Sequence, residues 1–335
     1  MNDLSIMQIA LEEAQKGRGL VAPNPLVGAI LILDGKIISK GFHGEDGVKH
    51  AERIVIEKAQ KENIDLSNST LYLTLEPCTH FGKTPPCVDL IIENKIKKVI
   101  IAQRDPNSLA SGGIEKLKQA GIKCKLGVLE KEAQYQIRFF RYWIQNKLPY
   151  FFGKLAISTD GFYAQDNKNI LISSNETKKK TREMRKDFDA ILVGKKTILV
   201  DNPILEAPDK NLFKIILCRT ADFSLKNLEI KKNNLILACQ KKTSNCDFSG
   251  KIIYYKNLND FQKQIFDFGI QSVLVEGGGE VLRLFLEHDL IQEFMLVKSK
   301  RVILNQGLKM PNLDNFYLFR EVDLSDDVLQ FFLKN

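Results

Sequence analysis

Four side chains in the first third of the chain have the types and spacing needed for metal-assisted hydrolysis. His50 and Glu52 flank a single alanine, Cys78 follows Pro77, and Cys87 follows a pair of prolines. An imidazole and two thiolates are ligands that zinc prefers, and a zinc site with three protein ligands keeps its fourth position open for water. The carboxylate of Glu52 would then be free to move protons.

This set matches the pattern of the zinc deaminases of nucleobases, in which a His/Cys/Cys set binds the metal and a glutamate transfers protons. The pattern therefore predicts removal of an exocyclic amine from a heterocycle. On a regular helix His50 and Glu52 would point in nearly opposite directions. We therefore expect His50 at a first helical turn, where the backbone geometry is still changing. A core histidine with two buried thiols is the alternative interpretation.

Size and composition predict a two-domain globular protein. The 335 residues exceed what one hydrophobic core usually organises. No apolar run approaches the roughly 20 residues of a membrane span, and the N-terminus lacks the pattern of a signal peptide, so a cytoplasmic location without membrane contact is expected. The formal charge of +8 suits either nucleic acid or a phosphorylated metabolite.

Hydrophobic spacing predicts alternating helices and strands in the first half. Asp34-Gly35 between two apolar runs is a hairpin signal. A hairpin followed by alternating helix and strand predicts a sheet covered by helices on both faces. Helices are expected over 4–16, from His50 onward, and over 88–94, 114–120 and 130–145, and strands over 27–33, 36–41, 70–75, 98–102 and 122–126.

Lys147-Leu148-Pro149 ends the last of these helices and predicts a boundary between domains at 1–147 and 148–335. The second half again predicts an α/β domain, with strands over 150–157, 190–193, 213–217, 234–238 and 272–275, and helices near 175–187, 259–268 and 281–288. Its run Val275–Glu280 joins a strand to a helix through three glycines, where exposed N–H groups can hold a phosphate. A flexible turn is the alternative.

The run from Thr74 to Cys87, with Pro23–Gly28 and Gly41-Phe42-His43 upstream, resembles the signature of the bifunctional riboflavin-biosynthesis deaminase/reductase family. The resemblance implies a cytidine-deaminase-like three-layer αβα domain that deaminates 2,5-diamino-6-(5-phosphoribosylamino)pyrimidin-4-one. It implies one Zn²⁺ on His50, Cys78 and Cys87, and Glu52 as the catalytic proton shuttle. The substrate contacts that it implies are Asn24, His43, His80 and Lys83.

Three segments of the second half resemble the reductase domain of the same family: Lys154–Gly161, Gly194–Thr197 with Asp201-Asn202-Pro203, and Val275–Gly279. The resemblance implies a dihydrofolate-reductase-like α/β fold that uses NADPH to reduce the ribosyl group of 5-amino-6-(5-phosphoribosylamino)uracil to ribityl. The residues that it places near NADPH are Ala156, Thr197, Asp201, Gly277, Gly278 and Gly279, and those near substrate are Lys154, Arg185, Leu205 and Glu276.

Two positions depart from the family pattern, which often has tryptophan where Leu171 falls and a basic residue where Pro208 falls. These changes would weaken the contacts with nicotinamide and phosphate. One alternative is therefore a deaminase with a non-catalytic second half, and another is a nucleic-acid base deaminase. The preferred interpretation is a homo-oligomeric enzyme that acts on a phosphorylated pyrimidine and binds no nucleic acid.

Overall fold

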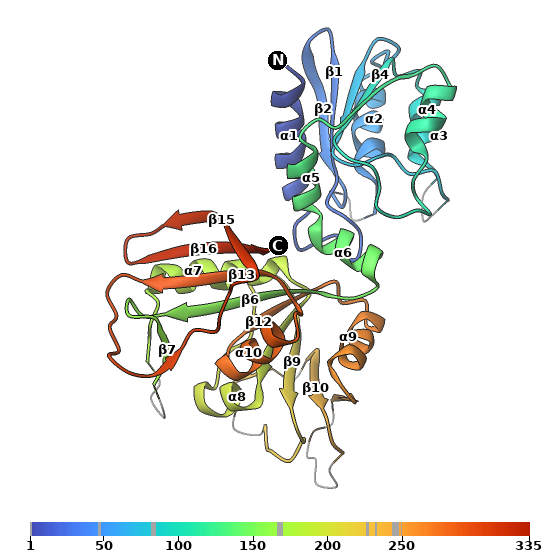
Figure 1. The fold of residues 1–335 in the computed structure, drawn as a ribbon. Coiled ribbons are helices and arrows are strands. Elements are labelled where there is room, and N and C mark those ends of the chain that lie inside the picture. Colours follow the sequence, from blue (N-terminus) through green and yellow to red (C-terminus); the bar gives the residue numbers. More distant parts are fainter. Residues whose placement is uncertain are drawn as a thin grey trace. The chain divides into compact units, whose positions relative to one another are not determined.

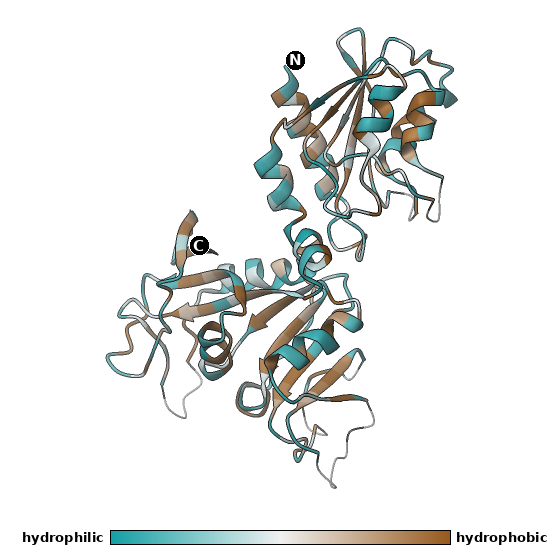
Figure 2. Ribbon diagram, turned by 45° about the vertical axis from the view of Figure 1, so that its right-hand side comes forward, coloured by the Kyte–Doolittle hydropathy of each residue, from teal (hydrophilic) through white to brown (hydrophobic). Residues whose placement is uncertain are grey.

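The computed structural model describes residues 2–45, 48–81, 85–165, 170–225, 228–231, 233–242, 248 and 250–335. The chain divides into two compact units, Met1–Lys147 and Leu148–Asn335 (Figure 1). Apolar residues concentrate in the strands of both units, which form the sheets at their centres (Figure 2). Within the described ranges, no helix combines the length and the apolar character that crossing a membrane requires.

The first unit is built around a five-stranded sheet of order β2-β1-β3-β4-β5. The neighbours β2, β1 and β3 run antiparallel, whereas β3, β4 and β5 run parallel. Its elements are α1 (Asp3–Gln15), β1 (Gly28–Leu33), β2 (Lys36–Phe42), α2 (Ala51–Lys61), β3 (Thr70–Leu73), α3 (Cys87–Glu93), β4 (Lys98–Ile101), α4 (Gly113–Gln119), β5 (Lys123–Leu126), α5 (Glu130–Gln136) and α6 (Arg138–Asn146).

Helices cover both faces of this sheet because successive side chains of a strand point to opposite sides. Ile30 and Ile32 of β1 pack in one core cluster with residues of α1 and α5. Ala29 and Leu31 of the same strand pack in another cluster with residues of α2, α3 and α4. The three-layer αβα arrangement predicted from the sequence is therefore confirmed.

The prediction of a single long helix over 130–145 is wrong, because the chain forms two helices that meet at Ile137. This residue has φ −103° and ψ 21°, outside helical geometry. Residues four apart on a regular helix share one face, yet Ala133 belongs to the cluster with α1 whereas Ile137 belongs to the cluster with α2. The break lets the chain contribute to both cores.

The second unit contains a nine-stranded sheet of order β11-β10-β9-β8-β12-β6-β13-β16-β15. The strands from β11 to β13 run parallel, and β16 and β15 extend the sheet antiparallel. Its elements are β6 (Tyr150–Ile157), β7 (Phe162–Ala164), α7 (Asn175–Met184), the 3-10 helix η1 (Arg185–Asp187), β8 (Ala190–Gly194), α8 (Lys195–Asp201), β9 (Phe213–Cys218), β10 (Leu235–Cys239), β11 (Lys251–Tyr254), α9 (Leu258–Asp267), β12 (Ser272–Glu276), α10 (Gly279–Glu287), β13 (Ile291–Ser299), β14 (Leu308–Lys309), β15 (Phe316–Asp323) and β16 (Asp327–Lys334).

Two core clusters lie on this sheet. Phe261 of α9 and Phe285 of α10 pack in one cluster with Val273 and Val275 of β12. Ile198 of α8 packs in the other cluster, together with residues of the connection between α8 and β9. In an open α/β sheet, ligands bind beyond the carboxyl ends of parallel strands, which directs attention to the turn between β12 and α10.

Candidate active site

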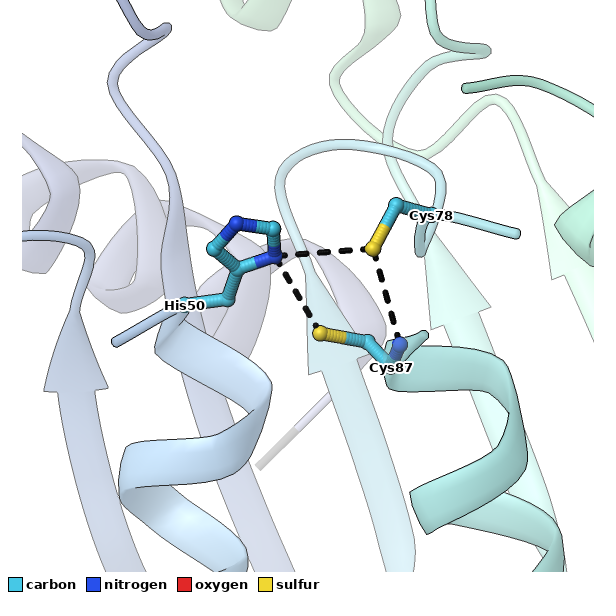
Figure 3. Close-up of side chains that lie close together, drawn as sticks. All are labelled: His50, Cys78 and Cys87. Carbon is cyan, nitrogen blue, oxygen red and sulfur yellow. Dashed lines mark hydrogen bonds between the residues drawn. The ribbon is translucent and has the colours of Figure 1, made fainter. Parts of the chain in front are cut away.

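His50, Cys78 and Cys87 converge on one point in the first unit (Figure 3). The imidazole Nδ1 of His50 lies 3.5 Å from Sγ of Cys78 and 3.3 Å from Sγ of Cys87. Zinc bonds of about 2.3 Å to sulfur and about 2.0 Å to nitrogen separate tetrahedral N and S ligands by about 3.5 Å. The donor set and its spacing therefore fit zinc.

Local backbone geometry brings these three residues together. His50 is the N-cap of α2 and has an extended backbone, with φ −70° and ψ 152°. Because this backbone is not helical, the side chain of His50 need not point away from Glu52 as it would on a regular helix. This agrees with the position at the start of the helix that the sequence predicted. Cys87 is the first residue of α3, directly after Pro86. Its backbone N–H donates to Sγ of Cys78 at 3.5 Å, which ties the two thiol segments together.

The electrostatics of the cluster favour a thiolate. Hydrogen bonding to Cys87 and the nearby His50 lower the pKa of Cys78 to about 4. The hydrogen bond with Cys78 and burial raise the pKa of Cys87. Of the two thiols, Cys78 therefore loses its proton first, and Cys87 keeps its own. Hydrogen bonding to Cys78 raises the pKa of His50 to about 9. A metal dication would remove the remaining protons, since its ligands bind in their deprotonated forms.

Glu52 lies on the first turn of α2 beside this cluster and is only 4% exposed. Burial raises the pKa of its carboxyl to about 6, partly offset by the positive charge on His50. A carboxyl whose pKa lies near neutrality can both accept and return a proton at physiological pH. Glu52 thus has the environment that a proton shuttle needs.

The other residues predicted near this site have different surroundings. His43 is buried, and its ring lies edge-on to the ring of His50 with centroids 5.3 Å apart. Asn24 is exposed in a turn, where its N–H donates to the carbonyl of Val21. His80 is exposed. Lys83 lies outside the described residues.

Two carboxyl groups near the cysteines were not singled out from the sequence. Glu76 is 2% exposed and accepts the backbone N–H groups of Asp105, Gly112 and Ile114 at 3.1–3.2 Å. Burial raises the pKa of Asp105 to about 6. Glu76 could have been found from the sequence, because it is a charged residue directly after the apolar run that ends at Leu75.

A second candidate site lies at the carboxyl end of β12. Gly277 and Gly278 have φ +106° and +62°, a backbone region that side chains rarely adopt, and Gly279 begins α10. A Cβ at Gly277 would lie 3.0 Å from Thr197 of α8. The predicted cofactor residues Gly277, Gly278 and Thr197 therefore contact one another, and the exposed N–H groups of such a turn suit a pyrophosphate.

Arg185 and Glu276 form a two-point ion pair beside this turn. Nε and Nη2 of Arg185 donate to the two carboxylate oxygens of Glu276 at 3.2 and 2.6 Å. Nη1 donates to the carbonyls of Ile204 and Glu206, which flank the buried Leu205. Three of the four residues predicted near the substrate, Arg185, Leu205 and Glu276, are therefore linked at this place.

Lys154, the fourth, lies on β6 in register with Glu276. Burial lowers its pKa, and the negative charge of Glu276 partly counters that effect. Ala156 follows on the same strand and is half-buried. Asp201 is exposed and is the last residue of α8, whereas Thr197 lies in the first turn of that helix.

The two departures from the family pattern are both at the surface. The side chain of Leu171 is 68% exposed, and Pro208 is exposed in the connection that follows Leu205. Neither residue therefore fills the core.

The two halves match different families of known proteins. Residues 1–103 match the cytidine and deoxycytidylate deaminase zinc-binding region, and residues 149–299 match the RibD C-terminal domain. These matches confirm the fold class predicted for each half.

Relatives match both halves together. Riboflavin biosynthesis protein RibD of Aquifex aeolicus is 34% identical over 325 residues, covering 93% of this chain and 90% of that protein. RibD of Actinobacillus pleuropneumoniae is 30% identical, covering 93% and 87%. A deaminase/reductase structure from Thermotoga maritima is 34% identical with a TM-score of 0.92, covering 99% and 98%. RibD of Acinetobacter baumannii is 26% identical with a TM-score of 0.88, covering 99% of both chains.

Proposed function

The chain belongs to the RibD family of bifunctional riboflavin-biosynthesis enzymes, and we propose that residues 1–147 carry its deaminase and residues 148–335 its reductase. The first reaction is zinc-dependent deamination of 2,5-diamino-6-(5-phosphoribosylamino)pyrimidin-4-one. The second is NADPH-dependent reduction of the ribosyl group of 5-amino-6-(5-phosphoribosylamino)uracil to ribityl. The convergence of His50, Cys78 and Cys87 beside a buried carboxylate is the observation that carries the deaminase assignment.

In the proposed deaminase site, His50, Cys78 and Cys87 hold the zinc ion. Bound zinc lowers the pKa of a coordinated water toward neutrality. Glu52 would accept a proton from the attacking water and pass it to the pyrimidine ring nitrogen, and would then move a second proton from the hydroxyl group added to the ring to the amine that leaves as ammonia. Its pKa of about 6 supports both transfers near neutral pH.

Substrate binding at this site is proposed for Asn24, His43, His80 and Lys83. The ring of His43 beside His50 supports its part in that assignment. The amide of Asn24 suits the donor and acceptor edge of a pyrimidine. The exposed imidazole of His80 suits polar groups farther from the ring.

In the proposed reductase site, the turn Gly277–Gly279, Thr197, Ala156 and Asp201 bind the cofactor. NADPH supplies the hydride when it is bound. Two glycines with positive φ and the close approach of Thr197 support a backbone cradle for its phosphates. Lys154, Arg185, Leu205 and Glu276 bind and orient the ribosyl substrate, and the Arg185–Glu276 pair keeps both charged groups in fixed positions.

The protein acts on a small molecule. A homo-oligomeric state, a cytoplasmic location and the absence of nucleic-acid binding stay predictions from the sequence.

The direct test incubates the purified full chain with the diaminopyrimidine phosphate, with and without NADPH, and identifies the products by mass spectrometry. Deamination replaces an amine with oxygen and raises the mass by about 1 unit, and reduction then raises it by about 2. Without NADPH we expect only the first change, accompanied by ammonia. Absence of ammonia release would refute the deaminase, and NADPH that stays unconsumed with the deaminated intermediate would refute the reductase.

A further inference from the structure

A pocket of about 240 Å³ lies beside the amino ends of β9 and β10. Its lining includes Leu205, Glu206, Lys210, Lys214, Lys231 and Asn233. Lys214 is the second residue of β9, and Asn233 lies two residues before the start of β10, whereas Gly277 follows the carboxyl end of β12. Since these strands are parallel, the pocket and the glycine turn lie at opposite strand ends. The volume is several times the roughly 30 Å³ that one water molecule occupies.

Lys214 is a buried cation in this pocket. It is 2% exposed, and its ammonium donates to the backbone carbonyl and the side-chain oxygen of Asn233 at 3.0 and 3.1 Å. Both partners are neutral, and no carboxylate of the described residues lies within ion-pair distance of it. Burial lowers the pKa of this lysine, and the negative charge of Glu206 partly counters that effect. A charge removed from water without a counter-ion is costly, so an anion that entered the pocket would be favoured.

Two further lysines make the lining positive. Lys231 pairs with Glu206 at 2.7 Å, and both side chains remain partly exposed. Lys210 reaches Asp189 at 3.4 Å. The Asp189 carboxylate also accepts the backbone N–H groups of Gln271 and Ser272. The lining therefore carries three ammonium groups and the carboxylate of Glu206. Each ammonium has three donors, which leaves donors free for a ligand.

We propose that this pocket binds a phosphate group through Lys210, Lys214 and Lys231. Lysine binds phosphate as a point charge, and hydrogen bonds between charged partners are stronger than neutral ones. A doubly charged oxyanion would use several of the free donors at once and would give Lys214 an anionic partner in direct contact, in place of its neutral ones.

Two sources of that phosphate are compatible with the pocket: the reductase substrate's own phosphate, or a separate phosphorylated ligand. The wall formed by Leu205 and Glu206 belongs to the segment whose carbonyls accept hydrogen bonds from Arg185, so the pocket adjoins residues proposed to bind the reductase substrate. The basic side chain that the family often has at position 208 is absent, since Pro208 stands there. Only the first source depends on the proposed reductase function.

The test measures binding of inorganic phosphate to the full chain by isothermal titration, comparing the unmodified protein with Lys214→Met. Methionine replaces most of the apolar body of lysine and removes the charge. We expect saturable binding that weakens at least about tenfold in the variant, since a hydrogen bond to a charged group contributes about 1.5–3 kcal/mol. The matched control is Lys263→Met, an exposed lysine of α9, which should bind phosphate like the unmodified protein. Circular dichroism checks that each variant is folded, and Lys231→Met, at an exposed position, replaces Lys214→Met if that variant does not fold.

Steady-state reductase kinetics then separate the sources. A rise of about tenfold in KM with unchanged kcat in Lys214→Met assigns the site to the substrate's phosphate. Unchanged KM with lost phosphate binding assigns it to a separate ligand. No saturable phosphate binding, or equal binding by Lys214→Met, overturns the proposal. Phosphate binding that persists in a protein unable to consume NADPH refutes the reductase alone.

Discussion

At the scale of single residues, the proposed deaminase site depends on one carboxyl group whose pKa burial raises toward neutrality. Glu52 is shielded from water at the start of α2, and its pKa rises to about 6 for that reason. His50 precedes the helix as its N-cap with an extended backbone, so its imidazole and the Glu52 carboxyl can face the same site. In the proposed mechanism, metal binding and proton transfer are thus divided between two residues that are close in sequence.

Glu52→Gln should separate these two roles. The amide has the same shape but cannot accept a proton, so the deamination rate should fall by about 10²–10⁴-fold. The zinc content should stay at one ion per chain, because His50, Cys78 and Cys87 are unchanged. Ammonia release and metal analysis measure both quantities. Glu62→Gln, an exposed position just after α2, is the matched control. A Glu52→Gln enzyme with normal ammonia release would remove Glu52 from the mechanism.

The zinc ligands could be predicted from sequence because their side-chain types and neighbouring prolines encode the chemistry locally. The lysine pocket could not be predicted in this way, because Lys231 lies far in sequence from Lys210 and Lys214 and is brought beside them only by the pairing of β9 with β10. The available signal was a lysine inside the apolar run Phe213–Cys218. A charge in such a run indicates that the strand faces something polar.

At the scale of elements, close packing of α1 against β1 depends on the absence of a side chain at Gly28. A Cβ added there would lie 2.0 Å from the carbonyl oxygen of Ala10 and 2.8 Å from the backbone nitrogen of Ala14. Both atoms belong to the backbone of α1, so neither can move as the end of a flexible side chain does. The N–H of Gly28 also donates to Thr74 at 3.0 Å, which fixes the strand from its other side.

Gly28→Ala should therefore lower the free energy of unfolding of the first unit by about 3 kcal/mol, at the upper end of overpacking costs. Urea denaturation followed by circular dichroism measures the change. Gly35→Asn is the control: Gly35 has φ +76° and nothing within 4 Å of an added Cβ, and asparagine tolerates that backbone region. Equal stability of Gly28→Ala and the unmodified chain would show that α1 can shift freely.

Hydrophobic periodicity predicted most helices and strands through β12 and α10, but it missed β7, α8 and β11, and two further features did not follow from it. Periodicity reports a buried face and not which core that face joins, so the break at Ile137 was missed. The strands after α10 were also not identified. β15 and β16 extend the sheet on one side, and much of β15 is exposed, so its pattern lacks the continuous apolar run of a buried strand.

At the scale of the whole molecule, each unit has its own sheet and its own core. The described core clusters of the first unit contain residues up to Phe140, and those of the second begin at Phe151. Each candidate ligand set likewise lies within one unit. The two reactions should therefore respond separately to changes in their own ligands.

Removal of zinc with a chelator should destabilise only the unit that holds His50, Cys78 and Cys87. A ligand present at about 1,000 times its Kd stabilises the folded state by about 4 kcal/mol. We expect two unfolding transitions by calorimetry, of which one moves to lower temperature on chelation and the other moves to higher temperature with NADPH. Deamination should be lost, while reduction of deaminated substrate continues. A single transition that responds to both ligands, or loss of both activities on chelation, would contradict this independence.

The buried carboxylate of Glu76 has a consequence for how this enzyme can vary. By accepting three backbone N–H groups between Asp105 and Ile114, it fixes the path of a segment that is mostly without regular structure. An insertion or deletion there would leave a buried charge with unmet acceptors. The length of this connection is therefore constrained as strictly as that of a core strand, and evolution can lengthen the enzyme more readily elsewhere.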